Sequence, residues 1–204
     1  MSRQEHIGRP PCAEVNPRTD LIEFMQIDCD YYTDRDTYTV NPGEQEEKGK
    51  PVIRLFGVNA VGNSVCAHIH NFTAYFYIHV VESHCSVTTE EIEEFRLCLN
   101  RYMHANDAVL EIELVEKYPI MHYQPNKQTF LKVYCSHPSF IARLRTVIEK
   151  GIMIGDKDCL SRVTYESNIP YPLRFMCDNE IGGMSWVRIN AGNWSFRQTS
   201  QKQS

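Results

Sequence analysis

The stretch FTAYFYIHVV at residues 72–81 decides the fold, because it is the plainest strand in the chain. Its even positions from Phe72 to Val80 are apolar, and its odd positions are Thr73, Tyr75, Tyr77 and His79. Successive side chains of a strand point to opposite faces, so this pattern predicts one face in a hydrophobic core and the other face outside it.

Helices and strands alternate after this strand. Thr88-x-x-Glu91 is a capping-box pattern ahead of apolar residues at helical spacing, and Pro138 opens a second such stretch that Gly151 closes. Further strands are expected at residues 109–115, 130–135 and about 161–165. The order from residue 72 to 165 is therefore strand, helix, strand, strand, helix, strand, which predicts a ferredoxin-like unit of the kind that RNA-recognition modules share.

The residues before this unit predict an antiparallel meander. Strands are expected at residues 21–27, 52–58 and 64–70, with a turn at Val61-Gly62-Asn63. The polar, acidic stretch 33–50 is expected to form a long surface loop. We therefore assign the chain to the α+β class, with an antiparallel OB-like meander over residues 20–71 and a ferredoxin-like, RRM-like βαββαβ unit over residues 72–165.

The two ends of the chain carry weaker signals. Residues 1–19 hold three prolines and no apolar period, which is typical of a flexible tail. Residues 166–204 are expected to contain a short helix at 173–179, a break at Gly182-Gly183 and a strand at 184–189.

Composition excludes several classes of protein. The 204 residues are 42% hydrophobic and 23% charged, which excludes a disordered, collagenous or coiled-coil chain. The net charge of −5 gives no general attraction for nucleic acid, so any such contact must be local. No apolar run approaches the roughly 18 residues of a membrane span, and the amino terminus lacks the apolar segment of a signal peptide. An intracellular protein without membrane contact is expected.

Cysteine and histidine spacing gives no strong sign of a metal site. The eight cysteines are spread widely without a Cys-x-x-Cys pair, so we expect free thiols that behave as buried hydrophobes where they fall in or beside strands and helices, namely Cys66, Cys98, Cys135, Cys159 and Cys177. His68-x-His70 places two imidazoles on one strand face ahead of His79, His84 and Cys85, but strand alternation explains that spacing. No nucleophile-elbow, phosphate-loop or dinucleotide motif occurs, so no catalytic residue and no metal ligand is predicted.

One strand face offers a candidate binding site. In the ferredoxin-like order the two central strands lie side by side, which brings five residues together on the face away from the helices: Tyr75, Tyr77, Phe130, Lys132 and Tyr134. Single-stranded nucleic acid stacks its bases on aromatic residues in such a position. The alternative is that this face packs against the meander or a neighbouring domain, and Glu111 and Glu113 on the adjacent strand would repel phosphate. Both interpretations stay open at this point.

Three stretches resemble a known family. They are QIDCDYY at 26–32, PVIRLFGV at 51–58 running into GNSVCAHIHNFTAYFY at 62–77, and RFMCD at 174–178 with IGGMSW at 181–186. In order and spacing they resemble the amino-terminal region of the catalytic subunits of eukaryotic DNA polymerase delta, in the B family, over residues 21–197. The paralogous zeta subunits share the Asp-Tyr-Tyr start and the strand pair, whereas the Gly-Met-Ser-Trp stretch followed by Ala191-Gly192 is more similar to delta.

The resemblance implies a function for the parent enzyme but no site in this chain. Such enzymes are DNA-directed nucleotidyltransferases with a 3′ to 5′ proofreading exonuclease, and they act in the nucleus with a sliding clamp and accessory subunits. Their polymerase site holds two magnesium ions. The resemblance carries no catalytic residue, metal ligand or cofactor onto any position here, and residues 166–204 would lead toward an exonuclease domain beyond the end of the sequence.

Two functions are therefore expected as alternatives. The first is a non-catalytic, amino-terminal portion of a replicative polymerase, a fragment that supports template DNA placement and packs on the exonuclease domain. The second is a free-standing single-stranded nucleic-acid-binding module, which the net charge of −5 disfavours.

Overall fold

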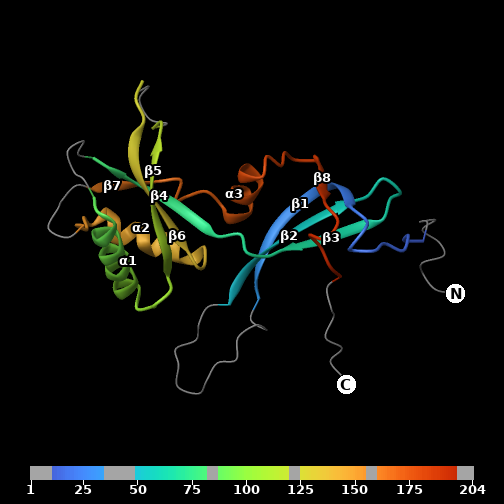
Figure 1. Cartoon of the computed structure of the whole chain (residues 1–204), viewed down its shortest axis with the longest axis horizontal. Helices are drawn as coiled ribbons and strands as arrows, with labels where there is room; N and C mark the ends of the chain where they lie inside the picture. The colour runs from blue at the N-terminus through green and yellow to red at the C-terminus, as the bar shows by residue number, and fades with distance from the viewer. Residues whose placement is uncertain (1–10, 35–48, 82–86, 120–124, 155–159, 197–204) are drawn as a thin grey trace, which may run out of the picture.

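The computed structural model describes residues 11–34, 49–81, 87–119, 125–154 and 160–196. Within these residues, eight strands form two antiparallel four-stranded sheets, and three helices pack on them (Figure 1). The α+β class with antiparallel sheets is confirmed. None of the helices in the described part of the chain is long and apolar enough to cross a membrane.

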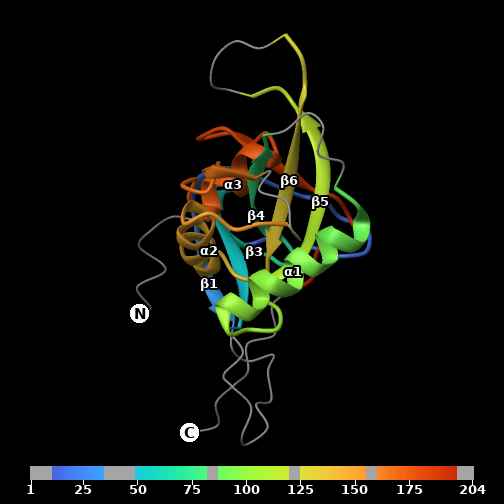
Figure 2. The ribbon, with the colours of Figure 1, turned by 90° about the vertical axis from the view of Figure 1, so that its left-hand side faces the viewer.

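The second sheet has the predicted ferredoxin-like topology. Its strands are β4 (Ala74–Val80), β5 (Val109–Lys117), β6 (Gln128–Cys135) and β7 (Leu160–Tyr165), in the order β5-β6-β4-β7. The helices α1 (Thr89–Met103) and α2 (Ser139–Glu149) cover one face of this sheet (Figure 2). Their apolar stripes bury Phe95 and Leu99 from α1 and Leu144 and Ile148 from α2 against Phe76 of β4. The even-numbered side chains of β4 therefore lie in the core, as the alternation of residues 72–81 predicts.

Both helices begin and end where local chemistry requires. The Glu91 amide donates to Thr88 Oγ1 at 3.3 Å, and the Thr88 amide donates to Glu91 Oε2 at 2.9 Å, so the predicted capping box is confirmed. The α1 helix ends at His104, which adopts a left-handed conformation with φ 53°. Gly151 follows α2 with φ +85°, a conformation that glycine adopts at little cost.

The first sheet contains the predicted meander and one further strand. Its strands are β1 (Ile22–Asp34), β2 (Lys50–Val58), β3 (Ser64–Ile69) and β8 (Trp186–Ile189), in the order β3-β2-β1-β8. The carboxy-terminal strand therefore returns to pair with β1, from Ile22 opposite Ile189 to Met25 opposite Trp186. Of the predicted loop at 33–50, both ends are strand, and residues 35–48 lie outside the described residues.

Strand β1 is longer than the expected 21–27 because it contains a bulge. The pairing with β2 shifts between Gln26 and Asp28, so the apolar alternation changes phase there. Gly57 lies opposite Gln26, and a Cβ atom at Gly57 would come within 2.4 Å of the Met25 carbonyl oxygen. Only glycine fits at this close approach of two strands.

Helix α3 (Tyr171–Asp178) joins the two sheets and lies between them in Figure 1. Tyr171 and Phe175 pack with Phe24 of β1 and Ile53 of β2 in a second hydrophobic cluster. The Tyr171 hydroxyl also donates to the Phe72 carbonyl oxygen at 2.5 Å. The chain entering β4 is thus held by the helix that follows β7.

Candidate functional site

The structure brings all five predicted site residues together. In the antiparallel pair β4 and β6, Tyr75 lies opposite Tyr134, Tyr77 opposite Lys132, and His79 opposite Phe130. The ring centroid of Tyr75 lies 5.6 Å from that of Tyr77 and 5.8 Å from that of Tyr134. The ring centroids of Tyr77 and Phe130 lie 6.4 Å apart. We call this group, with Tyr165 of β7 at its edge, the aromatic layer.

Most of the aromatic layer is buried. Tyr75 is 8% exposed, Tyr77 3% and Phe130 4%, whereas Lys132 and Tyr134 are half-buried. Tyr165 packs edge-on against Phe130 at 5.4 Å. Alternation predicts that these side chains share a face, but it does not show that they cover one another. A base could stack on Tyr75 or Tyr77 only after their neighbours moved aside.

The groups that cover the rings are cations. Lys132 Nζ lies 4.1 Å from the ring centroid of Tyr75 and 4.7 Å from that of Tyr134. Lys117 Nζ, from the end of β5, lies 4.6 Å from the centroid of Tyr77. A cation over an aromatic face is attracted by the ring quadrupole, so the rings hold the ammonium groups at the surface.

Lys132 is held in its charged form. Burial works to lower its pKa, but the hydrogen bond to Tyr134 and the nearby Tyr77, Tyr134 and Glu113 outweigh burial, and the pKa is raised overall. Glu113 also accepts a hydrogen bond from the Tyr134 hydroxyl at 3.1 Å. In the described part of the chain neither Lys117 nor Lys132 forms a salt bridge.

A third cation, Arg174 of α3, also lies over the Tyr75 ring. It is 7% exposed, with its guanidinium carbon 4.5 Å from the Tyr75 centroid. Its Nη1 donates to Glu166 Oε2 at 2.5 Å and to the Tyr75 hydroxyl at 3.3 Å. The Tyr75 hydroxyl in turn donates to the Asp178 carboxylate at 2.7 and 2.8 Å. Burial first, and this bond to Asp178 second, raise the pKa of Tyr75.

Sequence reasoning did not single out Arg174 as a site residue, although a signal was present. Arg174 and Asp178 stand four positions apart in RFMCD, a spacing that places both on one face of a helix. That face is the one α3 presents to Tyr75, so both residues bind the same tyrosine.

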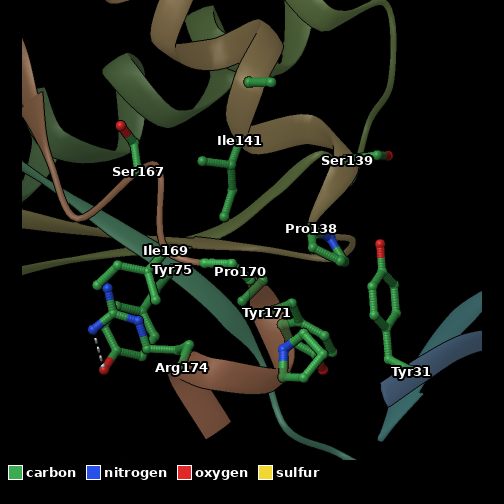
Figure 3. Close-up of a pocket in the computed structure, with 13 residues that line it drawn as sticks. Tyr31, Tyr75, Pro138, Ser139, Ile141, Ser167, Ile169, Pro170, Tyr171 and Arg174 are labelled. Carbon is green, nitrogen blue, oxygen red and sulfur yellow. Dashed lines mark hydrogen bonds between the residues drawn. The ribbon is translucent and has the colours of Figure 1, made fainter. Parts of the chain in front are cut away.

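A cleft of about 300 Å³ adjoins the aromatic layer (Figure 3). Tyr31 of β1, Pro138 at the start of α2, and Tyr171 of α3 line it. Tyr75 of the aromatic layer and Arg174, which lies over Tyr75, also line it. The rings of Tyr31 and Tyr171 meet edge to face at 5.2 Å. Burial, and then the neighbouring Tyr31, raise the pKa of Tyr171. The lining comes from four separate segments, so no local pattern in the sequence indicates this cleft.

The histidines and acidic residues do not assemble a metal site in the described residues, where no group of three or more His, Cys, Asp or Glu could hold an ion. His68 instead contacts the Tyr32 hydroxyl at 3.1 Å and Cys66 Sγ at 3.5 Å. His84 and Cys85 lie outside the described residues. Asp178 is the last residue of α3, and its carboxylate accepts a hydrogen bond from the Tyr75 hydroxyl.

The thiols of the described cysteines are free, but most of them are not buried. Cys135 is fully buried, and burial raises its pKa to about 12. Cys66 and Cys177 are exposed and Cys98 is half-buried, so the expectation of burial was wrong for these three. A position in a strand or helix does not by itself place a side chain on the core face; Cys66 shares the open face of the first sheet with His68. Cys159 lies outside the described residues.

Comparisons with known proteins all match this chain to the amino-terminal regions of DNA polymerase catalytic subunits. The family described as "DNA polymerase zeta catalytic subunit, N-terminal" matches residues 22–70, and "DNA polymerase delta catalytic subunit-like, N-terminal domain" matches residues 71–142. The DNA polymerase delta catalytic subunit of Drosophila melanogaster is 33% identical over 209 residues, which cover 99% of this chain and 19% of that protein. The subunit of Oryza sativa subsp. japonica is 35% identical over 181 residues, which cover 85% of this chain and 16% of that protein.

A solved structure shows the same fold. The family B DNA polymerase from the archaeon Pyrobaculum calidifontis matches 81% of this chain and 17% of its own chain, with a TM-score of 0.58 and 22% sequence identity. The chain spans about a fifth of the length of the curated relatives that it matches.

Proposed function

The chain corresponds to the amino-terminal region of DNA polymerase delta catalytic subunits, and on that premise we propose that it supports DNA replication as a non-catalytic portion of a family B polymerase that helps to place the template strand. The relatives are named for DNA synthesis, for which a template is required. The contribution that we propose for the described residues is contact with DNA and packing on the rest of the enzyme.

One observation carries the proposal of DNA contact: Lys117 and Lys132 lie over tyrosine rings with their charges at the surface. Phosphate contacts by lysine supply most of the sequence-independent affinity for nucleic acid. Glu111 and Glu113 of β5 lie directly opposite Tyr134 and Lys132, so their exposed carboxylates repel phosphate beside Lys132 and leave only a weak contact at the two lysines. The adjoining cleft offers an unpaired strand a second, aromatic contact at Tyr31.

Other properties of the parent enzyme belong to the same proposal. They are packing of this region on an exonuclease domain, proofreading by that domain, a nuclear location, and assembly with accessory subunits and a sliding clamp. Magnesium would serve the polymerase and exonuclease sites of the parent enzyme, through residues other than those described here.

The alternative of a free-standing nucleic-acid-binding module uses the same lysines. It requires the isolated chain to bind single strands usefully by itself, in spite of its net charge of −5. The template proposal requires only a weak contact that the rest of a polymerase reinforces.

The test is binding of a fluorescein-labelled single-stranded oligonucleotide to the full chain, followed by anisotropy over a range of salt concentrations. Lys117→Ala with Lys132→Ala should weaken binding and reduce the slope of log K against log salt by about 1.4, because each single-strand phosphate contact contributes about 0.7. Arg101→Ala and Lys150→Ala together form the matched control, because both side chains are exposed on the helical side of the sheet, away from the aromatic layer. Equal salt slopes for the two double variants would contradict DNA contact at the aromatic layer.

A further inference from the structure

A cysteine, a histidine and a tyrosine form a chain of contacts on the first sheet. The Sγ atom of Cys66 lies 3.5 Å from His68 Nε2, and the Tyr32 hydroxyl lies 3.1 Å from Nδ1 of the same imidazole. The rings of Tyr32 and His68 also meet edge to face, with their centroids 5.5 Å apart. The imidazole therefore contacts a thiol at one nitrogen and a phenol at the other. We call these three residues the thiol triad.

Strand alternation places the thiol triad on the open face of the first sheet. Val65 and Ala67 of β3 pack against the hydrophobic core, so Cys66 and His68 point to the other face. Tyr32 reaches the imidazole from β1, across the intervening strand β2. Cys66 is exposed, whereas the other two members are half-buried. The thiol is thus open to a small reagent, while the imidazole beside it is held in place.

A guanidinium group adjoins the thiol triad. The Arg54 guanidinium carbon lies 5.3 Å from the ring centroid of Tyr32 and 5.4 Å from that of Phe56. Its Nε and Nη2 donate to the Asp30 carboxylate at 2.7 and 2.5 Å, which fixes the group on this face. The bond to Asp30 is the largest cause of the raised pKa of Arg54, and the nearby Cys66 acts in the same direction. The cation is therefore close enough to the thiol to stabilise a thiolate.

Two carboxylates share this face of the sheet, and the strand register separates both from the thiol. Asp28 lies opposite Phe56, which in turn lies opposite Cys66 on the next strand. Asp30 lies opposite Arg54 and forms an ion pair with it. An imidazole and a guanidinium next to a thiol both favour loss of its proton, so this arrangement is that of an activated nucleophile and its base.

We propose that Cys66 is a modification site, at which the thiol forms a mixed disulfide with a low-molecular-weight disulfide. His68 Nε2 takes the thiol proton while its Nδ1–H donates to the Tyr32 hydroxyl oxygen, and Arg54 stabilises the thiolate. The thiolate attacks one sulfur of the small disulfide, so that a new S–S bond forms as the old one breaks. The departing thiolate takes the proton back from the imidazolium. The products are one mixed disulfide and one small thiol, and the exchange needs no further oxidant.

The test is the reaction of the reduced full chain with glutathione disulfide at pH 7, followed at each cysteine by mass spectrometry of its peptide. Cys177 of α3 is the internal control, because it is also exposed, but in the described part of the chain no histidine is hydrogen-bonded to its thiol. We expect the initial rate at Cys66 to exceed the rate at Cys177 at least about tenfold. Equal rates at the two cysteines would overturn the proposal, which is independent of DNA contact at the aromatic layer.

Two substitutions separate proton transfer from exposure. His68→Gln keeps a polar side chain that cannot take a proton, so the rate at Cys66 should fall to that at Cys177 while the rate at Cys177 stays unchanged. Tyr32→Phe removes only the group that orients the imidazole, and it should slow Cys66 by a smaller factor. An unchanged ratio of the two rates in His68→Gln would also overturn the proposal.

The pH profile of the unaltered chain provides a readout that needs no substitution. An ordinary thiol titrates near pH 8.5, so its rate rises about tenfold between pH 6.5 and 7.5, whereas assistance by an imidazole of ordinary pKa rises only about twofold. We expect the smaller rise at Cys66 and the larger one at Cys177, and a tenfold rise at both would contradict proton transfer to His68. If His68→Gln loosened the first sheet, the half-buried Cys29 would also be modified faster, and this pH profile then decides.

Discussion

Replacing Arg174 by alanine should lower the free energy of unfolding by about 3 kcal/mol. The Arg174 side chain is 9% exposed, and Glu166, which it binds at 2.5 Å, is 27% exposed. Removal of one member of a buried ion pair costs about 3–5 kcal/mol, and the partial access of water to Glu166 places this pair at the lower end. Loss of the cation over the Tyr75 ring is included in that figure, because the same side chain supplies both contacts.

The measurement is urea unfolding followed by far-ultraviolet circular dichroism, which reports both sheets. Arg188→Ala is the matched control, since Arg188 also binds a glutamate, Glu23, but with side-chain exposures of 65% and 46%. A surface pair of that kind contributes less than about 1 kcal/mol. A double-mutant cycle with Glu166→Gln should give a coupling energy above about 1 kcal/mol. Equal destabilisation by Arg174→Ala and Arg188→Ala would refute the stabilisation that we attribute to the buried Arg174–Glu166 pair.

Two further predictions concern the first sheet. Gly57→Ala should destabilise the fold by about 2–4 kcal/mol in urea unfolding, because the new Cβ would lie 2.4 Å from the Met25 carbonyl oxygen. Gly183→Ala is the control, since a Cβ there meets no atom within 4 Å, and it should change stability little. Equal effects of the two substitutions would contradict the close approach of β1 and β2 at the bulge. The raised pKa of Cys29, about 11, means that its thiolate is scarce at pH 8 and increases with pH. Alkylation followed by mass spectrometry should therefore label exposed Cys177 well before Cys29 at pH 8, and comparable rates would contradict the burial of Cys29.

The ferredoxin-like unit could be predicted because its signals are local. Each strand alternates over its own residues, and each helix carries its own cap and apolar stripe, as Thr88 and Leu144 illustrate. The first sheet was harder, since the bulge at Gln26 and Asp28 breaks the alternation that identifies a strand. The pairing of β8 with β1 joins residues from opposite ends of the chain, and no local pattern specifies it.

In the candidate site, too, local patterns predict some features and long-range contacts decide the others. Membership of the aromatic layer follows from the alternation of β4 and β6, so all five of its predicted residues lie together. Its burial depends on side chains from elsewhere, namely Lys117 at the far end of β5 and Arg174 on α3. Periodicity says which residues share a face, but only the tertiary fold says what covers that face.

The cations that lie over the tyrosine rings change how these tyrosines would contribute to binding a nucleic-acid strand. On an open platform, Tyr75 and Tyr77 would offer their ring faces to bases, and their replacement would abolish stacking. In this fold the ring faces are occupied by Lys132, Lys117 and Arg174, so the rings position cations instead. The DNA contact proposed for the two lysines depends on phosphates rather than on bases, and it is therefore indifferent to sequence. Indifference to sequence is what a template strand requires, because every base must pass the same surface.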